Sequence, residues 1–229
     1  LAEAMLKLTS MVMMYAPIGV FGLLTYTVGT YGAEVLLPLL KLIMVMFVAC
    51  IIHICIIYLP CIKYSGVPLK KFFKELTSTI LVAFSSASSA AALSSNLQSV
   101  QRLGASRPVS SFLIPLGNTI NMDGTAIYMG VCSIFAATFF GIDLTFDKQI
   151  LIVIIAMLAS VGTMGVPGAG VIMISMVFTQ VGIPLEAIAL IAGIDRVLDM
   201  MRTTLNVLGD ATGALTVSKA ENDMHPIQE

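Results

Sequence analysis

Charged residues are scarce in this chain. Only 11% of its 229 residues are Asp, Glu, Lys or Arg, whereas an ordinary soluble domain has about a quarter. The net charge is −1, so there is no excess of basic residues to bind a nucleic acid. Hydrophobic residues make up 58%, and several apolar runs approach or exceed the ~18 to 20 residues that span a bilayer core. The composition therefore predicts an all-α integral membrane protein with several spans and no nucleic-acid partner.

Paired cysteine motifs are also missing. Cys50, Cys55, Cys61 and Cys132 lie within or at the ends of apolar segments, without CxxC spacing. We interpret them as small hydrophobic side chains rather than metal ligands or disulfides. His53, in "VACIIHICII", has no acidic residue one turn away and is interpreted as a packed helix residue.

The N-terminal part, residues 1–75, is predicted to contain two transmembrane helices, over residues 4–28 and 36–60. The chain starts with Leu1 rather than methionine, and no signal peptide precedes it. We therefore expect a fragment whose upstream helices are absent.

Two basic loops follow and give the orientation. "IKYSGVPLKKFFKEL" contains four lysines, and "QRLGASR" contains Arg102 and Arg107, so both loops are predicted to be cytoplasmic. Between them, "LTSTILVAFSSASSAAALSSNLQSV" must leave the cytoplasm and return to it. Its apolar arm "ILVAF" is far too short to span, and its centre is serine and alanine. We predict a re-entrant hairpin over 76–108, because irregular backbone at membrane depth survives only against protein or water.

A second segment of the same kind lies at 150–183. "ILIVIIAMLAS" and "VIMISMVFTQV" are each about half a span, and the glycine- and proline-rich "VGTMGVPGAG" separates them. Flanks poor in Lys and Arg indicate that this hairpin enters from outside. Each hairpin precedes a longer segment, which predicts an inverted repeat of re-entrant hairpins and interrupted helices, the arrangement that marks a transporter's binding site. The predicted core, residues 76–229, thus consists of hairpin 76–108, interrupted helix 109–140, hairpin 150–183, polar helix 187–217 and a C-terminal tail.

The first longer segment is interrupted by polar residues in "TINMDGTAIY". Asn121, Asp123 and Gly124 stand in the middle of an apolar run. We expect Gly124 and the polar pair to unwind the helix there and free backbone carbonyls. Carbonyl and carboxylate oxygens are the ligands of hard cations, and Asp210 can meet Asp123 at the midplane. The interruption is therefore interpreted as half of a cation site.

The last long segment carries a polar stripe. Asp195, Asp199, Arg202, Asn206 and Asp210 follow one another at steps of three or four residues and fall on one helix face. Each charge near mid-membrane costs ~2.5 to 3.5 kcal/mol, so the stripe must face a cavity or its own partners. A purely structural network of ion pairs is the alternative interpretation.

These motifs together resemble a known family. "NMDGT" on the interrupted helix, "GVPGAG" at a hairpin tip, a serine-rich first tip and "LDMMRTTLNVLGD" on the last helix are similar to the glutamate/aspartate:cation symporters. The resemblance covers essentially the whole chain but only the C-terminal part of a family member. It implies a homotrimer formed through N-terminal helices that this chain lacks.

The resemblance also implies a substrate site between the two hairpin tips and the last helix. In it, Asp199 holds the substrate ammonium and Arg202 holds an acidic side chain, which agrees with the planar, always-charged fork of arginine. The full implied set is Ser88, Ser89, Thr125, Val166, Gly170, Asp199, Arg202, Thr203 and Asn206.

Sodium is the implied coupling ion, with no organic cofactor. The positions that match the family's cation sites are Gly117, Asn121, Asn206 and Asp210 for one sodium, Thr119, Ser160, Val161 and Thr163 for a second, and Asn121 with Asp123 for part of a third.

One departure from the family concerns arginine. Many archaeal members have one where this chain has Ala87, and animal members have one where it has Met200. Arg196 lies nearby on the same helix and is a candidate substitute.

The leading hypothesis is a sodium-coupled symporter for L-aspartate or L-glutamate in the plasma or inner membrane, and not an enzyme. Proton-coupled uptake of the same substrates or of C4-dicarboxylates is the alternative within the class. An intramembrane aspartyl protease with Asp123 and Asp210 as its pair is a remote alternative, since "NVLGD" lacks the G-x-G-D pattern. A passive channel is a further alternative, which two closed hairpin tips disfavour.

Overall fold

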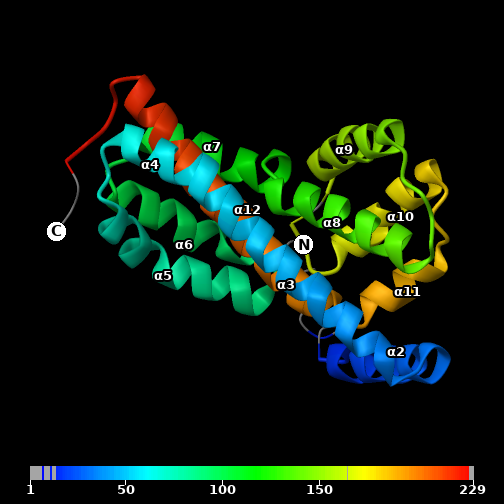
Figure 1. Cartoon of the computed structure of the whole chain (residues 1–229). Coiled ribbons are helices and arrows are strands. Elements are labelled where there is room, and N and C mark those ends of the chain that lie inside the picture. The colour runs from blue at the N-terminus through cyan, green and yellow to red at the C-terminus, as the bar shows by residue number, and fades with distance from the viewer. Residues whose placement is uncertain (1–6, 8–10, 12–13, 164, 227–229) are drawn as a thin grey trace.

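The computed structural model describes residues 7, 11, 14–163 and 165–226, and in these ranges all regular structure is helical (Figure 1). The elements in chain order are α2 (Ala16–Tyr31), the short η1 (Ala33–Val35), α3 (Leu36–His53), the π-helical η2 (Ile54–Tyr58), α4 (Leu59–Ser65), α5 (Leu69–Ser86), α6 (Ser89–Arg102), α7 (Arg107–Ile120), α8 (Asp123–Phe139), α9 (Phe146–Val161), α10 (Ala169–Val181), α11 (Glu186–Ala192) and α12 (Asp195–Ala220).

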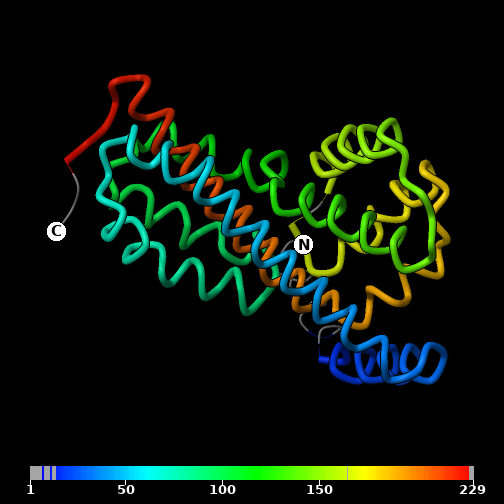
Figure 2. Tube along the Cα trace, viewed as in Figure 1, coloured from blue at the N-terminus to red at the C-terminus, as the bar shows by residue number. Residues whose placement is uncertain are grey.

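Two long helical stretches run side by side through the molecule. One is continuous from η1 through α4, and the other is α12, which packs along α3 and α4 (Figures 1 and 2). The helix predicted over 36–60 corresponds to this first stretch, which extends to Ser65. For the helix predicted over 4–28, much of the first part lies outside the described residues, and α2 begins at Ala16.

The first predicted hairpin corresponds to α5 and α6, which lie side by side. Its first arm is 18 residues long, so the expectation of a short arm "ILVAF" is wrong. The polar-looking residues before "ILVAF" join the helix because they are amphipathic, and Phe72, Leu76 and Ala83 share its buried face. Ala87 reverses the chain in a left-handed conformation with φ 51°, and Ser88 then caps α6.

The interrupted helix breaks at the start of the predicted polar stretch. α7 ends at Ile120 and α8 begins at Asp123, so the irregular residues are Asn121 and Met122. Gly124 lies inside the first turn of α8, and the expectation that it unwinds the helix is wrong. A Cβ at Gly124 would collide with the backbone carbonyl of Arg202, so this glycine permits α8 to lie directly against α12.

The second predicted hairpin corresponds to α9 and α10, which also pack together. After it, the segment 187–217 was expected as one helix, and the structure divides it into α11 and α12 at Gly193 and Ile194. A Cβ at Gly193 would lie 3.0 Å from Cδ2 of Leu24, which shows how closely this break packs against α2. Both hairpins are therefore followed by a pair of helices with a break between them.

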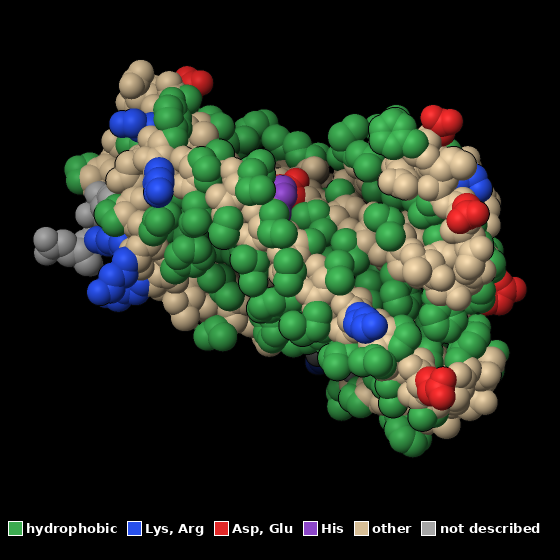
Figure 3. All heavy atoms as spheres, in the orientation of Figure 1, with side chains coloured by type: hydrophobic (Ala, Val, Ile, Leu, Met, Phe, Trp, Pro, Cys, Tyr) green, Lys and Arg blue, Asp and Glu red, His purple; other side chains and the backbone are tan. Residues whose placement is uncertain are grey.

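α12 is the centre of the fold. It packs against α3, α4, α5, α6, α7 and α8, which explains why most of its residues are buried. Hydrophobic side chains cover much of the outer surface, and lysine and arginine side chains gather at the end where α4 and the C-terminus lie (Figure 3). Within the described residues, Ala33–Ser65 and Arg107–Phe139 are long and apolar enough to cross a membrane.

Candidate functional site

The polar stripe of α12 lies inside the helix bundle. Asp195, Asp199, Arg202, Asn206 and Asp210 are all buried, with no side chain more than 7% exposed. Ionised groups this deep need partners, since an unpaired buried charge costs several kcal/mol. The contacts of each residue therefore indicate which groups the site is built to hold.

Asp199 and Arg202 are joined to each other. Arg202 Nε donates to Asp199 Oδ1 at 2.9 Å, and the Thr203 hydroxyl donates to the same oxygen at 3.1 Å. The other oxygen, Oδ2, accepts the backbone N–H of Gly168 at 2.8 Å, from the tip of the second hairpin. The carboxylate thus connects both partners on α12 with the tip between α9 and α10.

The rest of the Arg202 guanidinium lies against Tyr128 and Gly170. Its Cζ sits 4.6 Å from the centre of the Tyr128 ring, a cation–π contact. A Cβ at Gly170 would overlap Arg202 Nη1, so the arginine can lie there only because Gly170 has no side chain. Nη1 itself is buried without a hydrogen-bond partner among the described residues, and it is the free donor of the fork. Tyr128 was not predicted, because nothing in its local sequence distinguishes it from a core aromatic residue.

The two hairpin tips meet in front of this pair. The Ser88 hydroxyl donates to the Gly165 carbonyl at 3.0 Å, and the N–H of Ala90 donates to the same oxygen at 3.4 Å. Seven of the nine predicted substrate residues line one small cavity of about 10 Å³, and Ser88 and Gly170 adjoin it through the contacts above. The seven are Ser89, Thr125, Val166, Asp199, Arg202, Thr203 and Asn206.

One turn further along α12, the interruption between α7 and α8 meets Asn206. The Gly124 N–H donates to Asn206 Oδ1 at 2.7 Å, and the Asn121 amide donates to the Asn206 carbonyl at 3.2 Å. The Asn121 amide also donates to Asp210 Oδ1 at 2.9 Å. Gly117 leaves room for that carboxylate, because a Cβ there would overlap Oδ1. All four residues predicted for the first cation site therefore lie together, with amide, carbonyl and carboxylate oxygens that a hard cation prefers.

The second predicted cation set is not joined in the same way. Thr119 lies at the end of α7, exposed, with its hydroxyl bonded to the Leu116 carbonyl. Ser160 and Thr163 lie at the end of α9, and each hydroxyl is bonded to a carbonyl of the preceding turn, while Val161 is exposed. Within the described ranges, no hydrogen bond links Thr119 to the other three.

Asp123 contacts two residues that were not predicted. Its Oδ2 accepts from the Tyr58 hydroxyl at 2.8 Å and lies 3.1 Å from His53 Nε2. His53, interpreted from the sequence as a packed helix residue, packs edge-on against Tyr58, and its acidic partner lies 70 residues away in the sequence. Tyr58 also donates to the Leu205 carbonyl at 3.3 Å and so connects Asp123 to α12.

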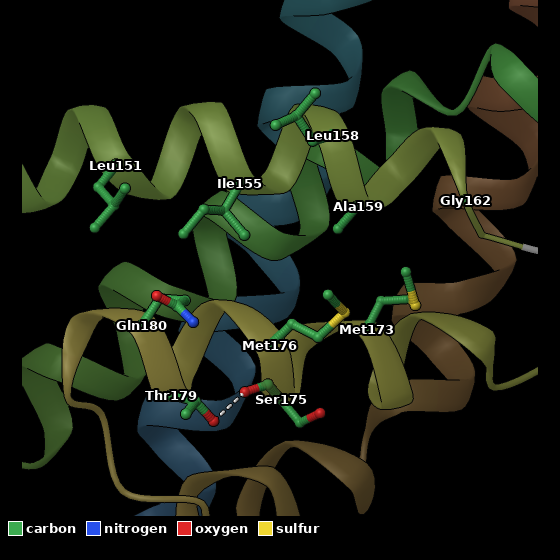
Figure 4. Close-up of a pocket in the computed structure, with 10 residues that line it drawn as sticks. All are labelled: Leu151, Ile155, Leu158, Ala159, Gly162, Met173, Ser175, Met176, Thr179 and Gln180. Atoms are coloured by element: carbon green, nitrogen blue, oxygen red, sulfur yellow. Dashed lines mark hydrogen bonds between the residues drawn. The ribbon is translucent and has the colours of Figure 1, made fainter.

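A wider groove lies outside this site. It has a volume of about 730 Å³ and runs between α9 and α10, lined mostly by apolar side chains such as Leu151, Leu158 and Met176 (Figure 4). It contains no charged residue, and the Thr179 hydroxyl at its polar end is already bonded to the Ser175 carbonyl. The groove therefore lacks the charges that would fix an ionic ligand.

The chain is similar to known symporter proteins. Residues 1–220 match the profile of the sodium:dicarboxylate symporter family. The chain is 37% identical over 220 residues to the proton/sodium-glutamate symport protein of Geobacillus stearothermophilus, covering 96% of this chain and 52% of that protein. It is 37% identical over 222 residues to the proton/glutamate-aspartate symporter of Escherichia coli K12, covering 97% and 51%. It is 32% identical over 218 residues to a C4-dicarboxylate transport protein of Bacillus subtilis, covering 95% and 52%. The chain thus spans about half the length of the curated relatives it matches.

Proposed function

The chain belongs to the sodium:dicarboxylate symporter family, and we propose that it forms the substrate-binding core of a secondary active symporter that takes up L-aspartate or L-glutamate with sodium ions. The family consists of membrane transporters rather than enzymes, which removes the aspartyl protease hypothesis. In agreement, Asp123 and Asp210 bond to different partners.

The observation that carries the proposal is the buried Asp199–Arg202 pair beside two hairpin tips. An acidic α-amino acid has one ammonium and two carboxylates. The ammonium suits Asp199, and the side-chain carboxylate suits the arginine fork, whose Nη1 is free. Backbone and hydroxyl donors of the tips, including Ser89 and Val166, suit the α-carboxylate.

Substrate entry requires the second hairpin to move. A cavity of about 10 Å³ holds roughly one water molecule, so an amino acid fits only after the tip withdraws. The bond between Gly168 N–H and Asp199 is one that a substrate ammonium can replace.

In this proposal the hairpins are re-entrant. Three of the four arms, of 13 to 16 residues, are ~20 to 24 Å long, shorter than the ~30 Å hydrocarbon core, which supports re-entry.

Sodium binds in this proposal where Asn206 and Asp210 approach the break after α7. The ligands are the carboxylate of Asp210 and carbonyl oxygens near Gly117, Asn121 and Asn206. The second and third cation sites remain proposals on the residues named above. The complete protein is proposed to be a multi-pass protein of the plasma or inner membrane and, by the resemblance, a homotrimer.

Two alternatives within the class have support in the relatives. Some are named as proton-coupled glutamate or glutamate-aspartate symporters, and others as C4-dicarboxylate transport proteins. A C4-dicarboxylate has no ammonium, so it would leave Asp199 facing another acid. The buried acid at this position therefore favours an amino acid.

Uptake by proteoliposomes that contain the complete protein tests the proposal. Radiolabelled aspartate, glutamate and succinate are supplied with an inward sodium gradient, an inward proton gradient, or neither. We expect sodium-dependent uptake of aspartate or glutamate and little uptake of succinate. Uptake driven by protons alone, or a preference for succinate, would establish the corresponding alternative.

A further inference from the structure

Arg196 joins the first hairpin to α12. It lies in the first turn of α12, one turn before Asp199. Its Nη2 donates to the Ser85 carbonyl at 2.8 Å, and its Nη1 donates to the Ser86 carbonyl at 3.3 Å. Ser85 and Ser86 are the last two residues of α5. The guanidinium therefore connects the tip of this hairpin with the helix that carries Asp199 and Arg202.

These carbonyls are free to accept because α5 ends at Ser86. Ala87 is left-handed, and its N–H makes the last helical hydrogen bond, to the Ala83 carbonyl. The carbonyls that follow have no donor within the helix and carry the negative end of its dipole. A cation at this point is favourable because it supplies the missing donors and lies at the negative end of the helix dipole. Arginine suits two successive carbonyls because its planar fork presents two N–H groups at once.

The same stretch of backbone fixes the proposed substrate residues of the tip. The Ser86 hydroxyl accepts the N–H of Ser88 at 3.1 Å, and the Ser88 hydroxyl accepts the N–H of Ala91 at 3.3 Å. A short series of hydrogen bonds thus runs from Arg196 through Ser86 to Ser88 and the start of α6. Ser89 follows directly and lines the cavity beside Asp199.

We propose that Arg196 is a positioning residue that fastens the first hairpin tip to α12, so that Ser88 and Ser89 stay aligned with Asp199 while the second hairpin opens. This inference rests on the proposed function. The second tip has a different attachment, since its bond to α12 runs from Gly168 to the Asp199 carboxylate that the substrate would engage. Substrate exchange therefore breaks the attachment of the second tip and leaves that of the first intact.

A competing role for Arg196 is direct contact with the substrate. Its side chain also lines a cavity of about 230 Å³ together with Asp195, Asp199 and Gly168. A substrate contact and a positioning contact differ in what they control. The former affects preference among substrates, whereas the latter affects how often the first tip opens, with or without substrate.

Alkylation of a cysteine in the first hairpin tests whether Arg196 holds the first tip against α12. The complete protein, with Cys55 and Cys61 replaced by serine, carries Ala92→Cys, because Ala92 is buried on α6 against Val207 of α12 and can react only when the first hairpin moves away from α12. The rate of reaction with a maleimide from the cytoplasmic side is measured without substrate. We expect Arg196→Ala to raise this rate at least about tenfold, equal to ~1.4 kcal/mol, and Arg196→Lys to lie in between. Arg107→Ala, which removes an exposed arginine elsewhere, should leave the rate unchanged.

Equal rates in the wild type and Arg196→Ala would overturn the proposal. If Arg196→Ala does not purify as a monodisperse protein, Arg196→Gln takes its place with the same expectation.

Calorimetric titration then compares aspartate with serine. Positioning predicts that both affinities fall by the same factor, whereas a selective loss of aspartate would assign Arg196 to the substrate. If neither aspartate nor glutamate binds the wild type, the proposed function fails. The labelling rates still show whether Arg196 holds the first tip against α12.

Discussion

Arg202 Nε lies 2.9 Å from Asp199 Oδ1, and each of these two side chains is only 3% exposed. The pair neutralises two charges that would otherwise be buried alone. The expectation that Asp199 holds the substrate ammonium and Arg202 an acidic side chain therefore has to account for this pairing. In the proposed mechanism, the substrate is inserted between two groups that already hold each other, and its ammonium and carboxylate take over part of each partner's role.

Replacing Arg202 should change selectivity between acidic and neutral substrates. Arg202→Cys removes the fork for the side-chain carboxylate and leaves Asp199 for the ammonium. We expect the affinity for aspartate to fall at least ~30-fold, because a charge-assisted contact in a buried site is lost, while serine binding survives or improves. Calorimetric titration of the purified variant with both ligands measures the difference.

The matched control for that experiment is Arg107→Cys, which removes an exposed arginine far along the chain from α12. It should bind both ligands as the wild type does. If Arg202 merely neutralises the aspartates of α12, its variant will lose aspartate and serine alike or misfold, and equal losses would reject the assignment.

Replacing Asp210 should weaken sodium binding more than substrate preference. Asp210 accepts from the Asn121 amide, in contact with the break after α7 and one turn beyond Asn206. Asp210→Asn keeps the shape but removes the charge that a hard cation requires. We expect the sodium concentration for half-maximal aspartate binding to rise at least ~tenfold, with the ratio of aspartate to glutamate affinity unchanged. An unchanged sodium requirement would show that Asp210 is not a ligand.

The second hairpin should be the extracellular gate. Its tip is joined to the rest of the site by a few hydrogen bonds at Gly165 and Gly168, so its opening should cost little. Val166→Cys should react with an impermeant thiol reagent added outside, and saturating substrate should protect it. Ala90→Cys at the first tip serves as the comparison and should not react from outside. Reaction of Val166→Cys from the cytoplasmic side alone would contradict the proposed orientation.

The sequence predicted the features that arise within one segment. The serine- and glycine-rich stretches correspond to the turns of the two hairpins, and the polar stripe of α12 is buried along its whole length. Each of these follows from local rules, namely helix periodicity, the conformational freedom of glycine and the cost of buried charge. The length of α5 does not follow from its apolar run, because the first half of this helix is amphipathic rather than apolar.

Features that depend on contact between distant segments could not be predicted in the same way. Asp123 bonds to Tyr58 and His53, which lie 65 and 70 residues away, and neither has a local signal of its role. The same holds for Tyr128, which becomes the platform for Arg202 only after α8 packs on α12. A single sequence specifies which residues share a helix face, but it does not specify which other helix that face meets.

Gly124 provides a test of that packing, because its role differs from the one its sequence suggests. A Cβ at this position would overlap the Arg202 carbonyl and lie 2.8 Å from the Arg202 Cα, so α8 would be pushed away from α12. We expect Gly124→Ala to lower the free energy of unfolding by ~1 to 3 kcal/mol, the range for overpacking, and to weaken aspartate binding by displacing Arg202. Gly130→Ala is the matched control on the same helix, since its Cβ meets nothing within 4 Å. It should melt at the same or a higher temperature, because alanine favours helix over glycine. Thermal unfolding of both variants in detergent measures the contrast. Equal melting temperatures would mean that the packing of α8 on α12 does not depend on the missing side chain of Gly124.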